Sequence, residues 1–168
     1  MDTSRTRAPE WQAAQWFNSQ QPPSLASLRG KVIVLEAFQM LCPGCVSEGL
    51  PQTKRVHATF SPEQVAVIGL HTVFEHHQAM TPVSLEAFLH EYRIDFPVAV
   101  DLPDPQRSVP RTMAAYAMQG TPTLILIDAE GFIRQHYFGK VSDLVLGAEI
   151  AWLIAEAAEL APTAKPAD

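Results

Sequence analysis

Residues 30–45 read GKVIVLEAFQMLCPGC, and no other stretch of the chain says more about its architecture. It joins an apolar, β-branched run over residues 31–38 to two cysteines, Cys42 and Cys45, that are three positions apart. The run is typical of a buried strand, and we expect a helix over residues 43–60 directly after it. The sequence therefore places both cysteines at the junction of a strand and a helix.

A dithiol at such a junction suits thiol–disulfide exchange. The sulfur of Cys42 faces the positive end of the helix dipole and its unpaired backbone N–H groups. Both favour the thiolate, which is the nucleophile of the exchange. Pro43 suits the first helical position because its missing N–H is not needed there. Cys45, one turn further along and more buried, then resolves the mixed disulfide. The prediction is that Cys42 attacks and Cys45 releases the partner.

The same two cysteines allow two other interpretations. They are the only cysteines in the chain, and a structural bridge across so short a loop gains little from chain entropy. Both could still be ordinary buried side chains, or they could supply half of a structural zinc site, which needs four ligands. The other candidate ligands are histidines of a polar loop expected over residues 71–81: His71, His76 and His77.

Glu36 is a lone acid inside the apolar strand. A buried carboxylate is costly unless it is paired or protonated, so its presence there needs a reason. Strand alternation puts residues 36, 38 and 40 on one face, which we expect to lie under the dithiol. There Glu36, with a raised pKa, accepts the proton of Cys45 as the mixed disulfide breaks. The alternative is an acid at the edge or end of the strand that reaches water.

A second motif, Gly120-Thr121-Pro122-Thr123, stands directly before the apolar run TLILID. Proline is accommodated at the start of a strand, and often as a cis peptide bond in a tight connection. A plain turn with a trans bond is the alternative interpretation of the tetrapeptide.

The rest of the chain alternates strand and helix patterns and ends with a hairpin and a helix. Strands are expected over residues 65–70, 96–100, 123–128 and 132–138, and helices over residues 10–18, 84–92, 111–118 and 143–160. Gly49 and Pro51 should loosen the first turns of the helix after the cysteines. This order predicts a three-layer α/β/α sandwich on a central mixed sheet. We divide the chain into an N-terminal extension with a short helix (1–24), one α/β domain (25–161) and a flexible tail (162–168).

Length and composition exclude several classes of function. The 168 residues suit one domain, and 47% hydrophobic with 18% charged residues is ordinary for a globular protein. A net charge of −6 without a basic run argues against nucleic acid as a partner. No stretch is long and apolar enough to span a bilayer, and no secretory signal is visible. We therefore expect no membrane span, no cofactor and a cytoplasmic setting, or a periplasmic one if the chain is a processed form.

Taken together, these stretches resemble the thioredoxin superfamily, and more closely its TlpA/ResA-like branch, from about Leu25 to Leu160. The matching segments are GKVIVLEAFQMLCPGC, VAVIGL, FLHEYRIDFPVAVD, AAYAMQGTPTLILIDAEGFI and the closing helix. The most specific are the CxxC after a strand and the GTPT before TLILID. The resemblance implies a thioredoxin-like fold with a strand-and-helix insertion from His71 to about Arg93, where partner specificity resides.

The resemblance also implies roles for individual residues. Cys42 is similar to the family's exposed nucleophile, and Cys45 to its resolving thiol. Pro122 resembles the cis-proline that faces the dithiol, and Thr121 the residue that offers backbone hydrogen bonds to a bound partner. Glu36 stands where thioredoxins have a buried aspartate, which agrees with the proton-transfer role expected from its burial.

Two departures from the family concern the surface beside the nucleophile. Leu41 stands where the family usually has a tryptophan, so partners bind differently there. The dipeptide between the cysteines is Pro-Gly instead of the commoner orders, and this dipeptide helps to set the redox potential. The residues predicted to meet the substrate, all close to the cysteines in the expected fold, are Leu41, Pro43, Thr121 and Pro122.

The predicted activity is that of a thiol–disulfide oxidoreductase, working as a reductase. Its partners are a disulfide- or dithiol-bearing protein substrate and a second redox protein. The enzyme alternative is a thiol peroxidase of the peroxiredoxin type, which needs a hydroxyl residue three positions before the attacking cysteine, where this chain has Gln39. The non-enzyme alternative is a metal carrier that uses the cysteines with a histidine. The segment His71–Glu75 is also similar to thioredoxin-like domains joined to membrane electron carriers.

Overall fold

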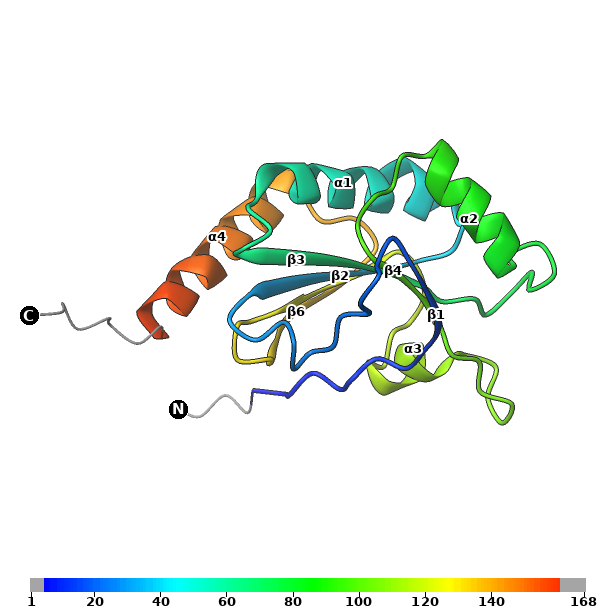
Figure 1. Cartoon of the computed structure of the whole chain (residues 1–168), viewed down its shortest axis with the longest axis horizontal. Coiled ribbons are helices and arrows are strands. Elements are labelled where there is room, and N and C mark those ends of the chain that lie inside the picture. Colours follow the sequence, from blue (N-terminus) through cyan, green and yellow to red (C-terminus); the bar gives the residue numbers. More distant parts are fainter. Residues whose placement is uncertain (1–4, 161–168) are drawn as a thin grey trace, which may run out of the picture.

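The computed structural model describes residues 5–160, which form a sheet with helices on both faces (Figure 1). In chain order the elements are β1 (Ala13–Phe17), β2 (Val32–Phe38), η1 (Cys45–Gly49), α1 (Leu50–Thr59), β3 (Val65–His71), α2 (Pro82–Glu91), β4 (Val98–Asp101), α3 (Arg111–Ala115), β5 (Thr123–Ile127), β6 (Ile133–Phe138) and α4 (Asp143–Leu160). The strand and helix patterns predicted from residue 31 onward are therefore confirmed, with boundaries that differ by a few residues.

The sheet has six strands in the order β1-β4-β3-β2-β5-β6. β3 runs parallel to both β2 and β4, and the other pairs are antiparallel, so the sheet is mixed. Every residue of β2 is buried. An interior strand that is covered on both faces requires a continuous apolar sequence, which is what residues 32–38 supply with the exception of Glu36.

Helices lie on both sides of this sheet and complete three layers. Figure 1 shows α1, α2 and α4 along one face and α3 along the other. Alternate residues of β2 enter two separate cores: Val34 and Phe38 pack with α1, α2 and α4, whereas Ile33 and Leu35 pack with α3 and the segment before β1. The predicted α/β/α sandwich is thus confirmed, and the fold is thioredoxin-like.

The helix predicted over residues 10–18 is wrong, because this segment contains the strand β1. Trp16 packs into the core on the α3 side, and its neighbour Phe17 packs into the core on the opposite side. Consecutive side chains point to opposite faces in a strand but not in a helix. β1 also pairs antiparallel with the outer edge of β4, whose backbone groups would otherwise lack partners. The tail predicted for residues 162–168 lies outside the described residues.

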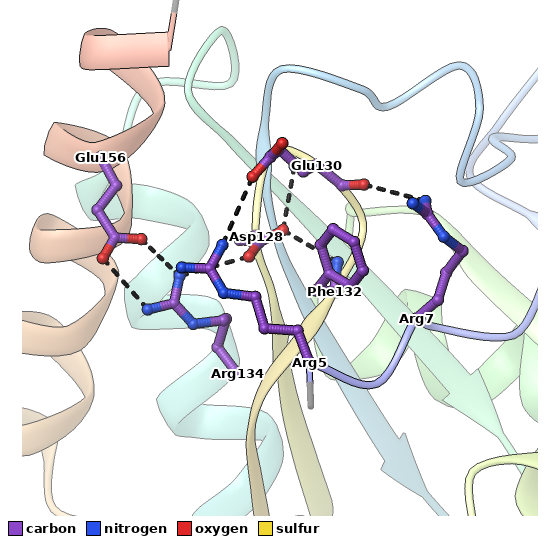
Figure 2. Close-up of polar contacts among 7 residues, drawn as sticks. All are labelled: Arg5, Arg7, Asp128, Glu130, Phe132, Arg134 and Glu156. Carbon is purple, nitrogen blue, oxygen red and sulfur yellow. Dashed lines mark hydrogen bonds and ion pairs between the residues drawn. The ribbon is translucent and has the colours of Figure 1, made fainter. Parts of the chain in front are cut away.

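The segment before β1 is joined to the turn between β5 and β6 (Figure 2). The N–H of Ala8 donates to the carbonyl of Gly131 at 3.0 Å. The guanidinium of Arg7 lies 4.5 Å from the centre of the Phe132 ring, and Arg5 lies 3.5 Å from Glu130. These contacts add the N-terminal segment to the edge of the domain.

A second set of charges in the same region connects the hairpin to the last helix. Arg134 on β6 pairs with Asp128 and with Glu156 on α4 (Figure 2). Because β5 begins directly after Pro122 and this turn follows its other end, the charge cluster lies at the end of the sheet away from the cysteines. It holds α4 against the hairpin and leaves the dithiol end of the sheet free.

The helix after the cysteines begins with an irregular turn. Residues Cys45–Gly49 form the π-helical turn η1, and the backbone N–H of Leu50 bonds to the carbonyl of Cys45. Regular α-helix follows from Leu50, with Pro51 in its first turn. The loosening expected from Gly49 and Pro51 is confirmed, and it takes the form of a wider turn, as is common near functional sites.

The segment predicted as an insertion, residues 71–93, holds the last residue of β3, a loop and the helix α2. α2 begins at Pro82, and the side chain of Thr81 accepts the N–H of Ser84 as its cap. No helix within residues 5–160 has the length and hydropathy needed to cross a membrane.

Candidate active site

Cys42 and Cys45 are joined in a disulfide at the carboxyl end of β2. Their Cα atoms are 5.2 Å apart. The side chain of Cys45 is completely buried in the core under α1, whereas Cys42 is half-buried and adjoins the exposed residues Leu41 and Pro43. One sulfur is therefore open to a partner and the other is not, which is the asymmetry that attack by one thiol and resolution by the other requires.

The backbone of the turn favours negative charge on Cys42. The N–H of Cys45 points at Cys42 Sγ, with a nitrogen-to-sulfur distance of 3.2 Å. An N–H at the start of a helix stabilises a thiolate through its own dipole and that of the helix behind it. The carbonyl oxygen of Thr121 lies 3.4 Å from the same sulfur, on the opposite loop.

The loop before β5 packs directly against the dithiol turn. The Thr121–Pro122 peptide bond is cis, as the family resemblance implies. A Cβ placed on Gly44 would lie 3.3 Å from Pro122 Cδ, so the ring fits closely against the dipeptide between the cysteines. The carbonyl of Pro122 accepts the N–H of Gly139 at 2.9 Å, which fixes the loop to the end of β6.

Glu36 is buried on the same side of the sheet as Cys45. Only 1% of its surface is exposed, and its Oε1 atom has no hydrogen-bond partner. Its neighbours on the strand face, Val34 and Phe38, belong to the same core as Cys45. Burial raises the pKa of the Glu36 carboxyl well above its ordinary value. The interpretation of Glu36 as a strand-end acid in contact with water is therefore wrong.

The carboxyl of Glu36 lies against the helix that follows the cysteines. A Cβ built on Gly49 would overlap Glu36 Oε1, and it would also come within 3.0 Å of Pro122 Cβ. Gly49 therefore brings together the acid on β2, the turn η1 and the loop before β5. Its outer side borders a polar cavity of about 270 Å³ that is also lined by Glu48, Gln52 and Lys140.

His71 does not belong to a polar loop as predicted. It is the last residue of β3, is 1% exposed, and its ring centre lies 5.3 Å from that of Phe38. Its Nε2 atom has no partner, and burial lowers its pKa to about 4, so the ring is neutral at pH 7. His76 and His77 are exposed on the following loop. Residues 5–160 contain no group of three or more His, Cys, Asp or Glu side chains placed to hold a metal ion.

Gln39 links the dithiol turn to the segment 71–93. Its side-chain oxygen accepts the N–H of Phe74 at 3.1 Å, and its amide nitrogen lies 3.4 Å from Glu75 Oε1. Its carbonyl accepts the N–H of Cys42 at 3.2 Å. The predicted insertion is thus connected by one buried side chain to the residue expected to attack.

Sequence reasoning assigned no role in the site to three residues that shape this region. Gly44 and Gly49 allow Pro122 and Glu36 to approach the helix. Phe138 at the end of β6 is 55% exposed, and its ring would touch a Cβ on Gly120. Two glycines in the first turns of a helix are unfavourable and could have drawn attention to a close approach. No sequence pattern distinguishes Phe138.

Comparisons with known proteins agree with this geometry. The family model described as "AhpC/TSA family" matches residues 5–136. The crystal structure of a thioredoxin-like superfamily protein is 61% identical, with a TM-score of 0.87, over 96% of this chain and 99% of that chain. A thiol-disulfide isomerase from Corynebacterium glutamicum is 48% identical, with a TM-score of 0.83, over 88% of this chain and 97% of that one.

A more distant similarity concerns a much longer protein. Protein DipZ of Mycobacterium tuberculosis is 28% identical over 127 residues, which is 74% of this chain but 17% of DipZ. The chain thus spans less than a fifth of the length of that curated relative.

Proposed function

Because the chain belongs to the AhpC/TSA family, within the thioredoxin-like thiol–disulfide oxidoreductases, we propose that it reduces disulfides of partner proteins through Cys42 and Cys45. One observation supports this most: a half-exposed sulfur and a fully buried one form a disulfide, and a buried carboxyl group lies against the helical turn that begins at the second cysteine. A structural bridge has no need of the acid, whereas an exchange reaction does.

The first step is attack on the partner. The thiolate of Cys42, stabilised by the N–H of Cys45, attacks one sulfur of the partner's disulfide. A bond forms between Cys42 Sγ and that sulfur, the partner's disulfide bond breaks, and its second sulfur leaves as a thiolate that takes a proton from water. The product is a mixed disulfide between Cys42 and the partner.

The second step releases the partner. The thiol of Cys45 gives its proton to the carboxylate of Glu36, and its sulfur attacks Cys42 Sγ. The Cys42–Cys45 bond forms, and the partner leaves as a thiolate that is then protonated. Two electrons pass from the dithiol to the partner, and a dithiol protein of the same chemical class must later restore the reduced state. Burial raises the pKa of the Glu36 carboxyl, which makes its carboxylate a stronger base than an exposed one and suits it to take the proton of Cys45.

The partner would bind over the surface around Cys42. Leu41 is 57% exposed, and Pro43 is exposed beside it. Thr121, next to the cis bond, has its carbonyl close to Cys42 Sγ, where an extended partner segment can pair with the backbone. We propose a cytoplasmic setting, in which partner disulfides are kept reduced.

Trapping of the intermediate tests this function. Cys45→Ser should accumulate a mixed disulfide with a disulfide-bonded protein substrate, visible by mass spectrometry and released by dithiothreitol. Cys42→Ser should form none and should show no turnover. Full turnover by Cys45→Ser would contradict the two-cysteine mechanism.

A thiol peroxidase is the second candidate, because the matching family model is that of AhpC/TSA. Gln39 stands where a peroxidase needs a hydroxyl group, and its side chain is engaged with Phe74 and Glu75. We therefore expect hydrogen peroxide to be consumed at the rate of an ordinary exposed thiolate. Consumption faster than reduction of a protein disulfide would favour the peroxidase over the reductase.

A further inference from the structure

Gly49 occupies a place in the helix where glycine is not required by the backbone. Its φ and ψ are −60° and −57°, values that any helical residue adopts. In this conformation alanine is more favourable than glycine, since glycine loses more freedom on folding. The reason for a glycine at this position must lie in the space around it.

That space is filled by the carboxyl group of Glu36. A Cβ on Gly49 would overlap Glu36 Oε1 and approach the Pro122 ring to 3.0 Å. The helical glycine Gly147, in α4, differs: a Cβ on it would meet no atom within 4 Å. The missing side chain of Gly49 is therefore matched to one particular group.

The carboxyl group of Glu36 is enclosed. Glu36 lies on β2, where it is paired with Gly69 on one side and Leu124 on the other, so its backbone is fixed. Its side chain is 1% exposed, and the oxygen nearest to Gly49, Oε1, is buried without a hydrogen-bond partner. This free oxygen is the atom available to take a proton.

We propose that Gly49 is a positioning residue that holds the Glu36 carboxyl under the dithiol, and that its missing Cβ is what allows a glutamate in place of the shorter aspartate at position 36. The inference rests on the proposed role of Glu36 as proton acceptor for Cys45. It predicts that the two positions are coupled. Glycine at position 49 leaves room for glutamate at position 36, whereas alanine at position 49 leaves room only for aspartate. Aspartate is shorter than glutamate by one methylene group, which is about the space that the added methyl group of alanine needs.

The test is a cycle of Gly49→Ala, Glu36→Asp and the double variant, with the reduced full chain. Each protein is mixed with 5,5′-dithiobis(2-nitrobenzoate), an aromatic disulfide. Cys42 attacks it and releases one thionitrobenzoate. Cys45 then loses its proton and attacks Cys42 Sγ, which releases the second thionitrobenzoate and forms the Cys42–Cys45 bond. The two releases are followed by stopped-flow absorbance from pH 5 to 9.

Gly49→Ala should slow the second release about tenfold or more and shift its pH dependence, since a displaced base loses much of its catalytic contribution. The first release should stay unchanged. Glu36→Asp alone should also slow the second release, and the double variant should return to within about threefold of the original rate. Gly147→Ala is the matched control and should leave both releases unchanged.

Two outcomes overturn the inference and are distinguishable. If Glu36→Gln releases the second group at the original rate and pH dependence, the proton-transfer role fails and the inference fails with it. If Glu36→Gln is slow but the losses of Gly49→Ala and Glu36→Asp simply multiply in the double variant, only the inference fails.

A measurement of stability in urea distinguishes the proposed effect of Gly49→Ala from general misfolding of the variant. Gly49→Ala should lower the urea midpoint when residue 36 is glutamate but not in the background of Glu36→Ala, where the overlapping oxygen is gone. An equal loss in both backgrounds would show that Glu36 is not the group that Gly49 accommodates.

Discussion

Replacement of Glu36 by glutamine should change how the stability of the oxidised protein depends on pH. The folded state keeps the Glu36 carboxyl protonated above its ordinary pKa of 4.5, because burial raises its pKa. In the unfolded chain the same group ionises near 4.5. The folded state therefore binds more protons than the unfolded one, and stability falls as pH rises between the two pKa values. Glutamine has no proton to lose, so this fall should disappear.

The magnitude follows from linkage. Between pH 4.5 and the pKa of the folded state, Glu36 lowers the free energy of unfolding by about 1.4 kcal/mol per pH unit. His71 acts in the opposite direction. Burial lowers its pKa from 6.5 to about 4, so the unfolded chain binds the extra proton and stability rises over that range. The two buried groups thus act on stability in opposite directions above pH 4.5.

Urea unfolding of the disulfide form at half-unit intervals from pH 4 to 8 measures this effect. In the original protein the fall caused by Glu36 and the rise caused by His71 should oppose each other above pH 4.5. Glu36→Gln should gain stability up to pH 6.5 and stay level beyond. The difference between the two should grow with pH by up to about 1.4 kcal/mol per pH unit and stop growing at the pKa of the folded state.

The same substitution at an exposed site, Glu63→Gln, controls for the loss of one negative charge. Parallel curves for Glu36→Gln and the original protein would refute the reasoning, because they would mean that Glu36 ionises equally in the folded and unfolded states.

Three further predictions concern other parts of the site. When the pH falls from 7 to 4, the free energy of unfolding of His71→Phe should rise by about 3 kcal/mol relative to that of the original protein. The reason is that His71 binds a proton more readily in the unfolded chain than in the folded one, so acid destabilises only the protein that has this histidine. Urea titration at the two pH values measures this difference. Asp101→Ala should cost about 3 kcal/mol in urea unfolding, because three buried donors, on Thr72, Thr112 and Met113, lose their acceptor; a loss below about 1 kcal/mol would contradict this. Leu41→Ser should lower kcat/KM about threefold to tenfold for a protein disulfide but not for a small aromatic disulfide, as expected if this exposed side chain contacts only large partners.

Much of the fold could be predicted because its most distinctive strands and helices are encoded by short, continuous stretches of sequence. The apolar run 31–38, the cysteine pair and the hairpin after Pro122 have compositions that suit only one type of structure. The strand β1 could not be predicted in this way. Trp16 and Phe17 fit the face of a short helix as well as the two faces of a strand, and the free edge of β4 decides between them. That edge exists only in the folded chain.

The same distinction applies to the site. The burial of Glu36 was foreseeable, because a lone acid in an apolar strand has few other environments. The burial of His71 was not, since a histidine next to polar residues is typical of a loop, and only its contact with Phe38 places it in the core. The role proposed for Gly49 depends on contacts with two residues that are distant in the sequence. Glu36 lies thirteen positions earlier, on β2, and Pro122 lies much later, in the loop before β5. Such three-way contacts leave no periodic pattern.

The redox equilibrium of the Cys42–Cys45 pair tests the central claim most directly. The protein is equilibrated with graded ratios of reduced and oxidised glutathione, extended with dithiothreitol, and the fraction of free thiol is measured by alkylation and mass spectrometry. A reductase of protein disulfides should show one two-electron transition at a potential more negative than about −240 mV, near the cytosolic glutathione value. A transition at a clearly more positive potential would assign the protein to disulfide donation, and failure to form the disulfide at any ratio would contradict a redox function altogether.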